Sequence, residues 1–558
     1  MSQLGRAEVR AALTAPGQPY ELQTVQTDRG EIRWFANLPQ TLRDLYDQNA
    51  TDKEFLVFGD ERLTFRDAHD RIARIAAVLR EHGVQKGDRV AISMRNYPEW
   101  MLSFAAASCL GAIAVGMNSL WQTEEMEYAL RDAAPKVLLA DRERLAQFRE
   151  LPDLGVTAIP VRCEGEPGEL RERIAVLGAV PMPEQELSAD DPVVILYTSG
   201  STGHPKGVLS THRGVLAAIY AWELDAAEQI ARRSPDEPVV PPPFPPTALL
   251  GIPLFHVMGL HGGFVASWRA QRRVVCMTKW DVAHAAELIE RERVTSFSAP
   301  PAMTGDLVRE AQRSSRDLSS LASVGGGGAA RAPEQVRQID ATFQRAVPSI
   351  GWGMTETNAA GTLISGAEYL AHPDAAGYRL SVIDLRVVDS EDRALPDGER
   401  GELQVRGAPM FVEYWNRPDA MADSFAPDGW FRTGDVAHLD GDLLYIVDRV
   451  KDLIIRGGEN IGCGHVEAVL LAHPHVVEAA VYAVPDERLG EEVGATVHGT
   501  PELDVDDLRE FLSRHLARHE VPRYIFATPE PLARTATGKV FKRELREQGV
   551  ALVEQQQP

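Results

Sequence analysis

The stretch that organises this sequence is Tyr197-Thr198-Ser199-Gly200-Ser201-Thr202-Gly203-His204-Pro205-Lys206-Gly207-Val208. The residues that lead into it, Val193 to Tyr197, are β-branched, apolar or aromatic, and they predict a buried strand. Its glycines lack a Cβ and accept positive φ, so they expose backbone N–H groups beside several hydroxyls and a lysine. Such a concavity is typical of a polyphosphate site. The Walker pattern is not met, because Gly207 follows Lys206, and a flexible hairpin turn is the alternative.

Length and composition limit the classes of protein to consider. A chain of 558 residues exceeds one hydrophobic core, so we expect two or more domains. Apolar residues make up 44% and charged residues 25%, which is ordinary for a water-soluble globular protein. The formal net charge is −23, from 58 basic and 81 acidic residues. This balance argues against non-specific nucleic-acid binding, which depends on neutralisation of phosphates by Lys and Arg.

Cysteine usage and hydropathy indicate a cytoplasmic protein. The four cysteines lie far apart without paired spacing, which argues against a disulfide framework or a zinc site. The N-terminus lacks a basic-then-apolar signal sequence. Residues 101–120 are uncharged, but Gly111 and Gly116 interrupt them. A buried helix followed by a strand explains this segment better than a transmembrane span, and we expect at most peripheral membrane contact.

The first half of the chain alternates helices with strands. Thr64 and Asp67 have the spacing of a helix N-cap, an apolar face follows at helical spacing, and Gly83 is expected to end that helix. Strands are expected at residues 89–94, 111–116 and 137–140. This alternation predicts an α/β fold rich in parallel strands. Residues 1–35 carry little pattern, and we expect them to wrap over the surface.

The predicted secondary structure changes in the C-terminal part of the chain. From residue 384 short β runs separated by turns predominate, and a compact unit of about a hundred residues follows the charged segment Asp448 to Asp452. We therefore predict domains at residues 1–448 and 449–558. Before this change, several expected strands end in glycine-rich or polar residues, around 297–301, 325–329 and 351–357. Ligands collect at such strand ends in open α/β sheets, which predicts one shared crevice.

Seven motifs, taken in order, make the chain resemble the adenylate-forming superfamily of acyl-CoA synthetases, peptide-synthetase adenylation domains and beetle luciferases. The motifs are Tyr197–Val208, Gly327-Gly328-Ala329, Trp352–Glu356, Trp430–Asp435, Asp448–Asp452, Gly457–Asn460 and Thr535–Lys539. They extend over most of the chain. The resemblance implies a large N-terminal domain of αβ-layered sheets with a β-rich subdomain, and a small mobile α+β domain at the C-terminus.

The resemblance also implies a reaction in two halves. A carboxylate attacks the α-phosphate of ATP, pyrophosphate leaves, and an acyl-adenylate remains. A thiol, usually that of coenzyme A, then displaces AMP and forms a thioester. Two anions meet in the first half, so their charge has to be neutralised by preplaced donors, Mg²⁺ and a lysine. The expected cofactors and co-substrates are therefore ATP, Mg²⁺ and coenzyme A.

The resemblance assigns the nucleotide contacts to residues of this sequence. The β- and γ-phosphates would be held by Thr198, Ser199, Gly200, Ser201, Thr202, Gly203 and Lys206. Thr355 would contact the α-phosphate, and Glu356 would bind Mg²⁺, a cation that prefers oxygen ligands. The adenine would lie beside Gly327, Gly328 and Ala329 and against Trp352, Gly353 and Met354. Relatives more often have Tyr at the position of Trp352, and Trp keeps the ring face. Asp435 and Arg449 would bind the ribose hydroxyls.

The C-terminal motifs are implied to carry catalysis and movement. Lys539 would bridge the carboxylate and the α-phosphate during adenylation. For the second half-reaction the small domain would rotate about Lys451. The pantetheine tunnel would then be lined by Gly457, Gly458 and Glu459. Relatives commonly have Pro and Glu where this chain has Cys463 and His465, which puts only the local geometry in doubt.

The sequence predicts the identity of the carboxylic-acid substrate less directly than the nucleotide contacts. The resemblance places the acyl pocket at His256, Val257, Met258, Gly259, Leu260 and Gly325. These candidates include no Asp to take an amino group, and their small or apolar side chains favour a medium- or long-chain fatty acid, with an aromatic or other hydrophobic acid next. The alternatives are loading of a carrier-protein phosphopantetheine, a luciferase-like oxygenase, and an inactive nucleotide-binding relative. A homodimer is compatible with all of these readings.

Overall fold

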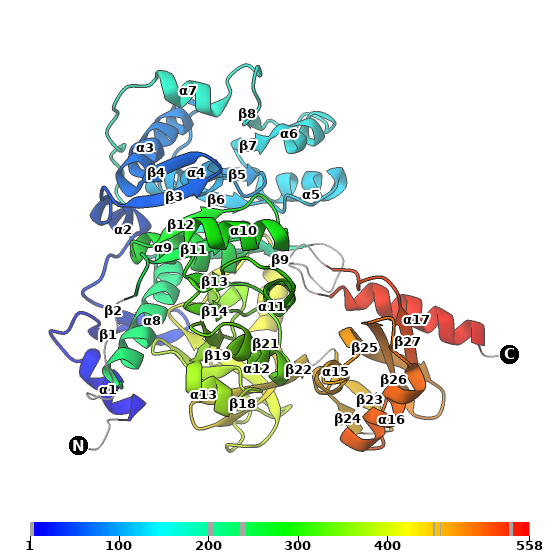
Figure 1. Cartoon of the computed structure of the whole chain (residues 1–558). Helices are drawn as coiled ribbons and strands as arrows, with labels where there is room; N and C mark the ends of the chain where they lie inside the picture. Colours follow the sequence, from blue (N-terminus) through cyan, green and yellow to red (C-terminus); the bar gives the residue numbers. More distant parts are fainter. Residues whose placement is uncertain are drawn as a thin grey trace.

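The computed structural model describes residues 5–198, 205–233, 242–449, 452–457, 459–534 and 540–556. Figure 1 shows a large body that carries most of the chain and a smaller C-terminal body beside it. The large body contains two extended sheets with helices packed around them, and the small body contains a five-stranded sheet of its own. This arrangement confirms the predicted mixed α/β fold.

The first extended sheet has seven strands in the order β20-β10-β9-β6-β5-β7-β8. Five neighbours within it run parallel: β5 (Arg89–Ser93), β6 (Ile113–Gly116), β7 (Val137–Asp141), β8 (Thr157–Val161) and β9 (Pro192–Thr198). Antiparallel pairing adds β10 (Lys206–Thr211) and β20 (Glu413–Tyr414) at one edge. The helices that connect these strands are α4 (Pro98–Cys109), α5 (Thr123–Ala133), α6 (Arg142–Arg149) and α7 (Leu170–Val176), and α3 (Phe65–Glu81) leads into β5. Helices that connect parallel strands confirm the predicted α/β pattern.

The second extended sheet has thirteen strands, which are mostly parallel in one part of the sheet and antiparallel in the other. Its parallel part contains β3 (Glu54–Phe58), β11 (Thr247–Leu250), β12 (Arg273–Cys276), β13 (Ser296–Ser298), β14 (Ser323–Gly325) and β15 (Val347–Ile350), with β4 (Glu61–Thr64) antiparallel at the edge. The antiparallel part contains β16 (Thr362–Ser365), β17 (Gly377–Arg379), β18 (Ile383–Val388), β19 (Gly401–Gly407), β21 (Phe431–Asp440) and β22 (Leu443–Arg449). The predicted β-rich subdomain is this antiparallel part.

The remaining elements pack around these sheets or form the small body. Helices α2 (Leu42–Gln48), α8 (His212–Ala231), α9 (Ala266–Arg269), α10 (Val282–Glu292), α11 (Pro301–Arg313), α12 (Pro333–Thr342), α13 (Gly366–Ala371) and α14 (Pro418–Ser424) belong to the large body. The small body contains β23 (Ile454–Arg456), β24 (Glu459–Ile461), α15 (Cys463–Leu471), β25 (Val476–Asp486), β26 (Gly490–Gly499), α16 (Val505–His515), β27 (Tyr524–Thr528) and α17 (Lys542–Gln556). Strand β22 is the last strand of the large sheet and β23 begins the small one, while the boundary at 448/449 stays a prediction.

Local sequence signals account for several of these elements. Thr64 caps α3: its hydroxyl accepts from the N–H of Asp67, whose carboxylate in turn accepts from the N–H of Thr64. Gly83 follows the helix with φ +75°, as expected for the glycine that ends it. Within residues 101–120, α4 is buried along its whole length and β6 follows, which confirms the helix-and-strand interpretation.

The N-terminal segment differs from our expectation. Instead of only wrapping over the surface, it forms α1 (Arg6–Leu13) and a hairpin of β1 (Leu22–Thr27) and β2 (Gly30–Phe35). Trp34 and Phe35 are buried in the main core. Arg10 binds the buried Glu228 of α8 at 2.7 Å. These contacts join residues far apart in sequence, so no local periodicity marks them.

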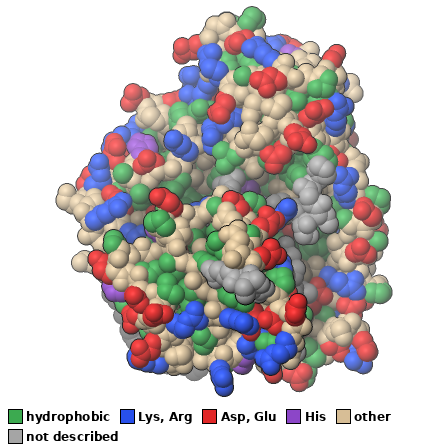
Figure 2. Space-filling model, turned by 90° about the vertical axis from the view of Figure 1, so that its right-hand side faces the viewer, with side chains coloured by type: hydrophobic (Ala, Val, Ile, Leu, Met, Phe, Trp, Pro, Cys, Tyr) green, Lys and Arg blue, Asp and Glu red, His purple; other side chains and the backbone are tan. Residues whose placement is uncertain are grey.

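Two further observations concern the surface. Among the helices in the described part of the chain, none is both long and apolar enough to cross a membrane. Figure 2 shows the face on the side of the small body, where acidic and basic side chains are interspersed and the surface is hollowed near its centre. The negative net charge is therefore not gathered into one acidic patch on this face.

Candidate active site

The phosphate stretch joins two paired strands. The predicted strand Val193 to Tyr197 is confirmed as part of β9, which ends at Thr198, and β10 begins at Lys206 directly opposite. The predicted phosphate contacts Ser199, Gly200, Ser201, Thr202 and Gly203 lie outside the described residues. The antiparallel register therefore fixes where the stretch starts and ends, at the carboxyl end of β9 where ligands collect in α/β sheets.

Lys206 and Glu356 are connected through a tyrosine that our sequence reasoning did not identify. The Lys206 ammonium lies 4.9 Å from the centre of the Tyr414 ring. The Tyr414 hydroxyl donates to Oε1 of Glu356 at 2.8 Å, across 58 positions of sequence. Burial and the Glu356 carboxylate raise the pKa of this hydroxyl far above its ordinary value, so it remains a donor. Strand β20, paired with β10, brings Tyr414 to this place.

The segment after β15 presents Thr355 and Glu356. A short 3-10 helix, η2 (Thr355–Thr357), follows the strand end. Glu356 is 6% exposed, whereas Thr355 is half-buried at the same edge. Gly353 allows the close approach of the returning chain, because a Cβ there would lie 2.4 Å from the carbonyl oxygen of Ala359. The sharp turn thus places the predicted α-phosphate and Mg²⁺ residues next to each other at the sheet edge.

Trp352, Asp435 and Arg449 meet at the neighbouring edge. The indole Nε1 of Trp352 donates to Oδ2 of Asp435 at 2.8 Å. Arg449 Nε lies 2.7 Å from Oδ1 of the same carboxylate. Strands β21 and β22 place Asp435 and Arg449 opposite each other in register. The two residues that we assigned to the ribose are therefore in direct contact, and the residue assigned to the adenine touches one of them.

The glycine motif runs beside this segment. Gly327 forms an isolated parallel bridge with Gly351, and the N–H of Gly351 donates to the Gly326 carbonyl at 3.0 Å. Gly328 has φ +78°, and both Gly328 and Ala329 are exposed at the end of β14. A β-carbon at Gly327 would meet the Gly351 carbonyl at 2.8 Å, so a side chain is excluded there. The backbone of this motif is left open to a ligand beside Trp352.

The predicted acyl-pocket residues lie on and before a π-helix, η1 (Met258–Val265), an element that the sequence did not predict. Such helices are rare and occur frequently at functional sites. His256, Val257 and Met258 are half-buried, while Gly259 and Leu260 are buried and Leu260 belongs to the main core. A β-carbon at Gly327 would lie 3.8 Å from Cε of Met258, so η1 adjoins the glycine motif. Gly325 is buried against the Ser349 hydroxyl.

Two histidines near this region are deeply buried. His261 of η1 is fully buried, with Nδ1 3.4 Å from the Asn358 carbonyl oxygen. Burial lowers the pKa of His261 to about 4. His212, at the start of α8, accepts the N–H of Leu42 at Nδ1, and burial likewise lowers its pKa to about 4. Both imidazoles are therefore neutral at pH 7.

Of the residues assigned to the small domain, only some are described. Gly457 has φ +61°, and its N–H donates to the Leu489 carbonyl at 2.8 Å. Glu459 is exposed on β24. The predicted hinge Lys451, the tunnel residue Gly458 and the predicted catalytic Lys539 lie outside the described residues. Their roles stay predictions.

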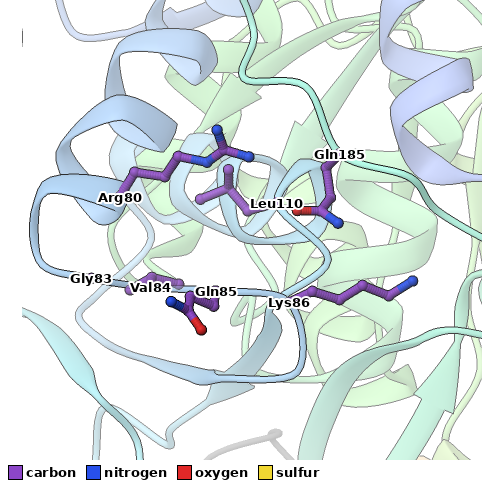
Figure 3. Close-up of a pocket in the computed structure, with 7 residues that line it drawn as sticks. All are labelled: Arg80, Gly83, Val84, Gln85, Lys86, Leu110 and Gln185. Atoms are coloured by element: carbon purple, nitrogen blue, oxygen red, sulfur yellow. The ribbon is translucent and has the colours of Figure 1, made fainter.

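A separate hollow lies at the opposite end of the first sheet. It has a volume of about 510 Å³ and is lined by Arg80, Gly83, Val84, Gln85, Lys86, Leu110 and Gln185 (Figure 3). Most of these residues precede β5 or β6, and Gln185 precedes β9, so the hollow faces the amino ends of the parallel strands. Its two cationic groups are engaged, with Lys86 2.7 Å from Asp191 and Arg80 bound to the Glu184 carbonyl. The nucleotide candidates lie at the carboxyl ends instead.

Comparison with known proteins agrees with this geometry. The AMP-binding enzyme family matches residues 44–415, and the AMP-binding enzyme C-terminal domain matches residues 465–539. The long-chain-fatty-acid–CoA ligase FadD13 of Mycobacterium tuberculosis is 33% identical over 88% of this chain and 94% of its own. A feruloyl-CoA synthase of Amycolatopsis is 32% identical over the same shares.

A solved structure extends the comparison to three dimensions. ATP-bound MatB from Rhodopseudomonas palustris superposes with a TM-score of 0.80 at 25% identity, over 92% of this chain and 99% of MatB. The similarity thus covers both bodies of the molecule. The chain belongs to the AMP-binding enzyme family and is an acid–thiol ligase of the adenylate-forming type.

Proposed function

We propose that this protein activates a hydrophobic carboxylic acid with ATP and transfers the acyl group to coenzyme A. In the first step a carboxylate oxygen of the acid bonds to the α-phosphorus of ATP, and the bond from that phosphorus to the bridging oxygen breaks. Pyrophosphate leaves with the electron pair. In the second step the thiol sulfur bonds to the acyl carbon, AMP leaves, and the thiol proton is released.

One observation carries the nucleotide part of this proposal. Two linked groups, Lys206–Tyr414–Glu356 and Trp352–Asp435–Arg449, meet at the segment that follows β15, beside the open glycine motif. They offer a cation and a carboxylate for the phosphates, and an aromatic face and a carboxylate for the nucleoside. The ATP bound to MatB supports the same assignment for this chain.

Mg²⁺ fits the residues present. In nucleotide sites it usually binds to one or two carboxylates, the substrate phosphates and several waters. Glu356 supplies such a carboxylate, and its hydrogen bond comes from a neutral hydroxyl that leaves the negative charge in place. Among the described residues no group of three or more His, Cys, Asp or Glu could hold a metal alone, which suits an ion that arrives with the nucleotide. When bound, Mg²⁺ would neutralise phosphate charge.

The remaining residues receive roles in the same scheme. Thr355 would donate to the α-phosphate, because this residue is half-buried at the start of η2, next to Glu356. Lys539 would bridge the attacking carboxylate and the α-phosphate, stabilising the charge that develops there. Lys451 would act as the hinge for the second step. Gly457, Gly458 and Glu459 would line the path of the pantetheine arm.

The chemistry of the acyl region favours an apolar acid. Residues 251–265 contain no Asp, Glu, Lys or Arg. A β-carbon at Gly262 would meet no heavy atom within 4 Å, although this residue is half-buried on η1, so space is left beside the π-helix. We therefore favour a medium- or long-chain fatty acid, as the name of FadD13 states for that relative, with an aromatic acid of the feruloyl kind second.

The test is pyrophosphate release from ATP with a panel of fatty, aromatic and amino acids, with and without coenzyme A. We expect the highest kcat/KM for a fatty acid and stoichiometric acyl-CoA when coenzyme A is present. Release without thioester would favour a carrier-protein acceptor. An absence of release with every acid would contradict the proposal and favour an inactive relative.

A further inference from the structure

The indole of Trp352 is held in one orientation by its surroundings. The backbone N–H of Trp352 donates to Oγ1 of Thr362 at 3.2 Å, and its carbonyl accepts from the Thr362 N–H at 3.0 Å. A β-carbon at Gly361 would lie 2.4 Å from Cε3 of the indole. The ring therefore packs directly on the Gly361 backbone, where a larger residue would displace it.

This orientation aims the only donor of the side chain at a carboxylate. Trp352 Nε1 lies 2.8 Å from Oδ2 of Asp435, which is 3% exposed, and the two residues are 83 positions apart. Arg449 engages the other oxygen at 2.7 Å, and the Asp435 N–H donates to the Thr433 hydroxyl at 3.1 Å. Together these contacts fix both the backbone and the carboxylate plane of Asp435.

We propose that Trp352 is a positioning residue for Asp435, in addition to offering its ring face to the base. The indole N–H fixes the rotation of the carboxylate, so that it faces the two ribose hydroxyls when a nucleotide binds. An ionised carboxylate has about four acceptor positions, two on each oxygen, so its rotation decides which directions these positions face. This inference rests on the proposed function, because it requires an adenine nucleotide at the site.

Two properties of the contact separate it from ordinary packing. A hydrogen bond to a charged acceptor is stronger than a neutral one and directional. The same side chain also lies next to the open glycine motif through Gly351. Binding of the base against the ring and binding of the ribose to Asp435 are therefore coupled through one rigid group. A tryptophan that only stacked would leave the ribose contacts independent of its N–H.

The experiment compares two nucleotides on the same enzyme preparations. The substitution Trp352→Phe keeps an aromatic face and removes Nε1–H. We measure kcat/KM for pyrophosphate release with ATP and with 2′,3′-dideoxy-ATP, which lacks both hydroxyls. Trp352→Phe is expected to lower the value for ATP about tenfold, the effect of one charge-assisted hydrogen bond. The loss with dideoxy-ATP is expected to be less than about twofold, because that nucleotide makes no contact for Asp435 to direct.

Trp280→Phe is the matched control. Trp280 also donates its indole N–H to an aspartate, Oδ2 of Asp306 at 3.0 Å, but it stacks on Phe297 and packs against a different hydrophobic cluster from Trp352. Its substitution is expected to leave the ratio of the two nucleotides unchanged. A variant that is only partly folded loses the same factor with both nucleotides, so the ratio of the two kcat/KM values is unaffected. Trp352→Met also lacks the donor, and it is expected to change this ratio as Trp352→Phe does. Equal losses with ATP and dideoxy-ATP would overturn the inference.

A binding measurement separates this inference from the proposed function. AMP and 2′,3′-dideoxy-AMP are titrated by calorimetry against the wild-type chain and Trp352→Phe. If AMP binds but no acid is activated, the proposed reaction is wrong. The positioning role is then still tested by the ratio of the affinities for AMP and 2′,3′-dideoxy-AMP, compared between wild type and Trp352→Phe. A wild-type chain that binds neither nucleotide would overturn both.

Discussion

Two glutamates in the two bodies of this molecule are held in opposite ways. In the large body, Glu356 accepts a hydrogen bond from the neutral hydroxyl of Tyr414 at 2.8 Å. In the small body, Glu467 lies 2.7 Å from the ammonium of Lys542 and also accepts the N–H of Val481. A neutral donor orients a carboxylate and leaves its charge in place, whereas a lysine cancels it. The first arrangement suits a cation-binding residue and the second suits a structural one.

The largest expected effect tests a charge that the small body would contribute. Lys539→Ala is expected to reduce acyl-adenylate formation by at least about 10²–10³-fold, because one preorganised donor to the developing charge is lost. Thioester formation from supplied acyl-adenylate is expected to survive. The two half-reactions are measured separately by pyrophosphate release and by acyl-CoA formation.

Lys542→Ala is the control for this experiment, since the ammonium of Lys542 is already paired with Glu467. The two side chains are only 32% and 19% exposed, so this change can lower stability. Measured per folded molecule, adenylate formation is expected to change less than about fivefold. Equal losses in both half-reactions for Lys539→Ala would remove Lys539 from the adenylation step.

The next effect compares the two glutamates directly. Glu356→Gln keeps the shape and removes the charge, and we expect kcat/KM for ATP to fall about 100-fold, with a higher Mg²⁺ concentration needed for half-maximal rate. Glu467→Gln is expected to leave the Mg²⁺ dependence unchanged. The measurement is a Mg²⁺ titration of pyrophosphate release with each variant. An identical Mg²⁺ dependence in wild type and Glu356→Gln would show that Glu356 does not bind the ion.

A smaller effect tests the neutral donor. Tyr414→Phe removes the hydroxyl that orients Glu356 and keeps the ring under Lys206. We expect kcat/KM for ATP to fall about tenfold, and the loss to be much smaller in a Glu356→Gln background. A double-mutant cycle measures this coupling. Additive losses would mean that Tyr414 acts on Lys206 or on packing and not on Glu356.

The smallest effect near neutral pH concerns groups whose charge is suppressed by burial. The pKa of His261 and of His212 is lowered to about 4 from an unfolded value near 6.5. Between these two pKa values the unfolded chain therefore binds more protons than the folded chain. The contribution of each histidine to the free energy of unfolding is fully present above pH 6.5 and is lost as the pH falls towards 4. Each histidine is expected to contribute up to about 1.4 kcal/mol per pH unit within that window.

Thermal unfolding followed between pH 7.5 and pH 4.5 checks this dependence. His261→Gln is expected to make the loss of stability with falling pH shallower than in wild type. Lys279→Gln serves as the control, because Lys279 is exposed and its charge is not among the causes of either histidine's pKa shift. A pH dependence that is the same in His261→Gln and wild type would show that this imidazole is not kept neutral by the fold.

Much of the architecture was accessible to sequence reasoning where the signals are local. The capping pair Thr64 and Asp67 predicted where α3 begins, and the β-branched run before Thr198 predicted β9. The glycine motif and the polar strand ends predicted one crevice, and the structure does bring Gly327 to Gly351. Each of these signals depends on a few consecutive residues whose backbone preferences are intrinsic.

Other features could not be read locally. The π-helix from Met258 to Val265 has no turn or capping signal of its own. The N-terminal residues 5–35 contact partners more than 200 positions away, such as Glu228 for Arg10 and Glu223 for Tyr20. Tyr414 sits on a two-residue strand, which is too short for a periodicity. Its role depends on pairing with β10, a contact between distant parts of the chain.

The sequence by itself determined the alternation of helices and strands, the motif order and hence the family. Only the tertiary structure decided which donors hold the candidate carboxylates: Tyr414 for Glu356, and Trp352 with Arg449 for Asp435. The physical reason is that backbone preferences act over a few residues, whereas hydrogen bonds to a buried carboxylate are selected by whichever strands the sheet brings together. The sequence thus supplies the side chains of the site, and the tertiary structure decides which of them contact one another.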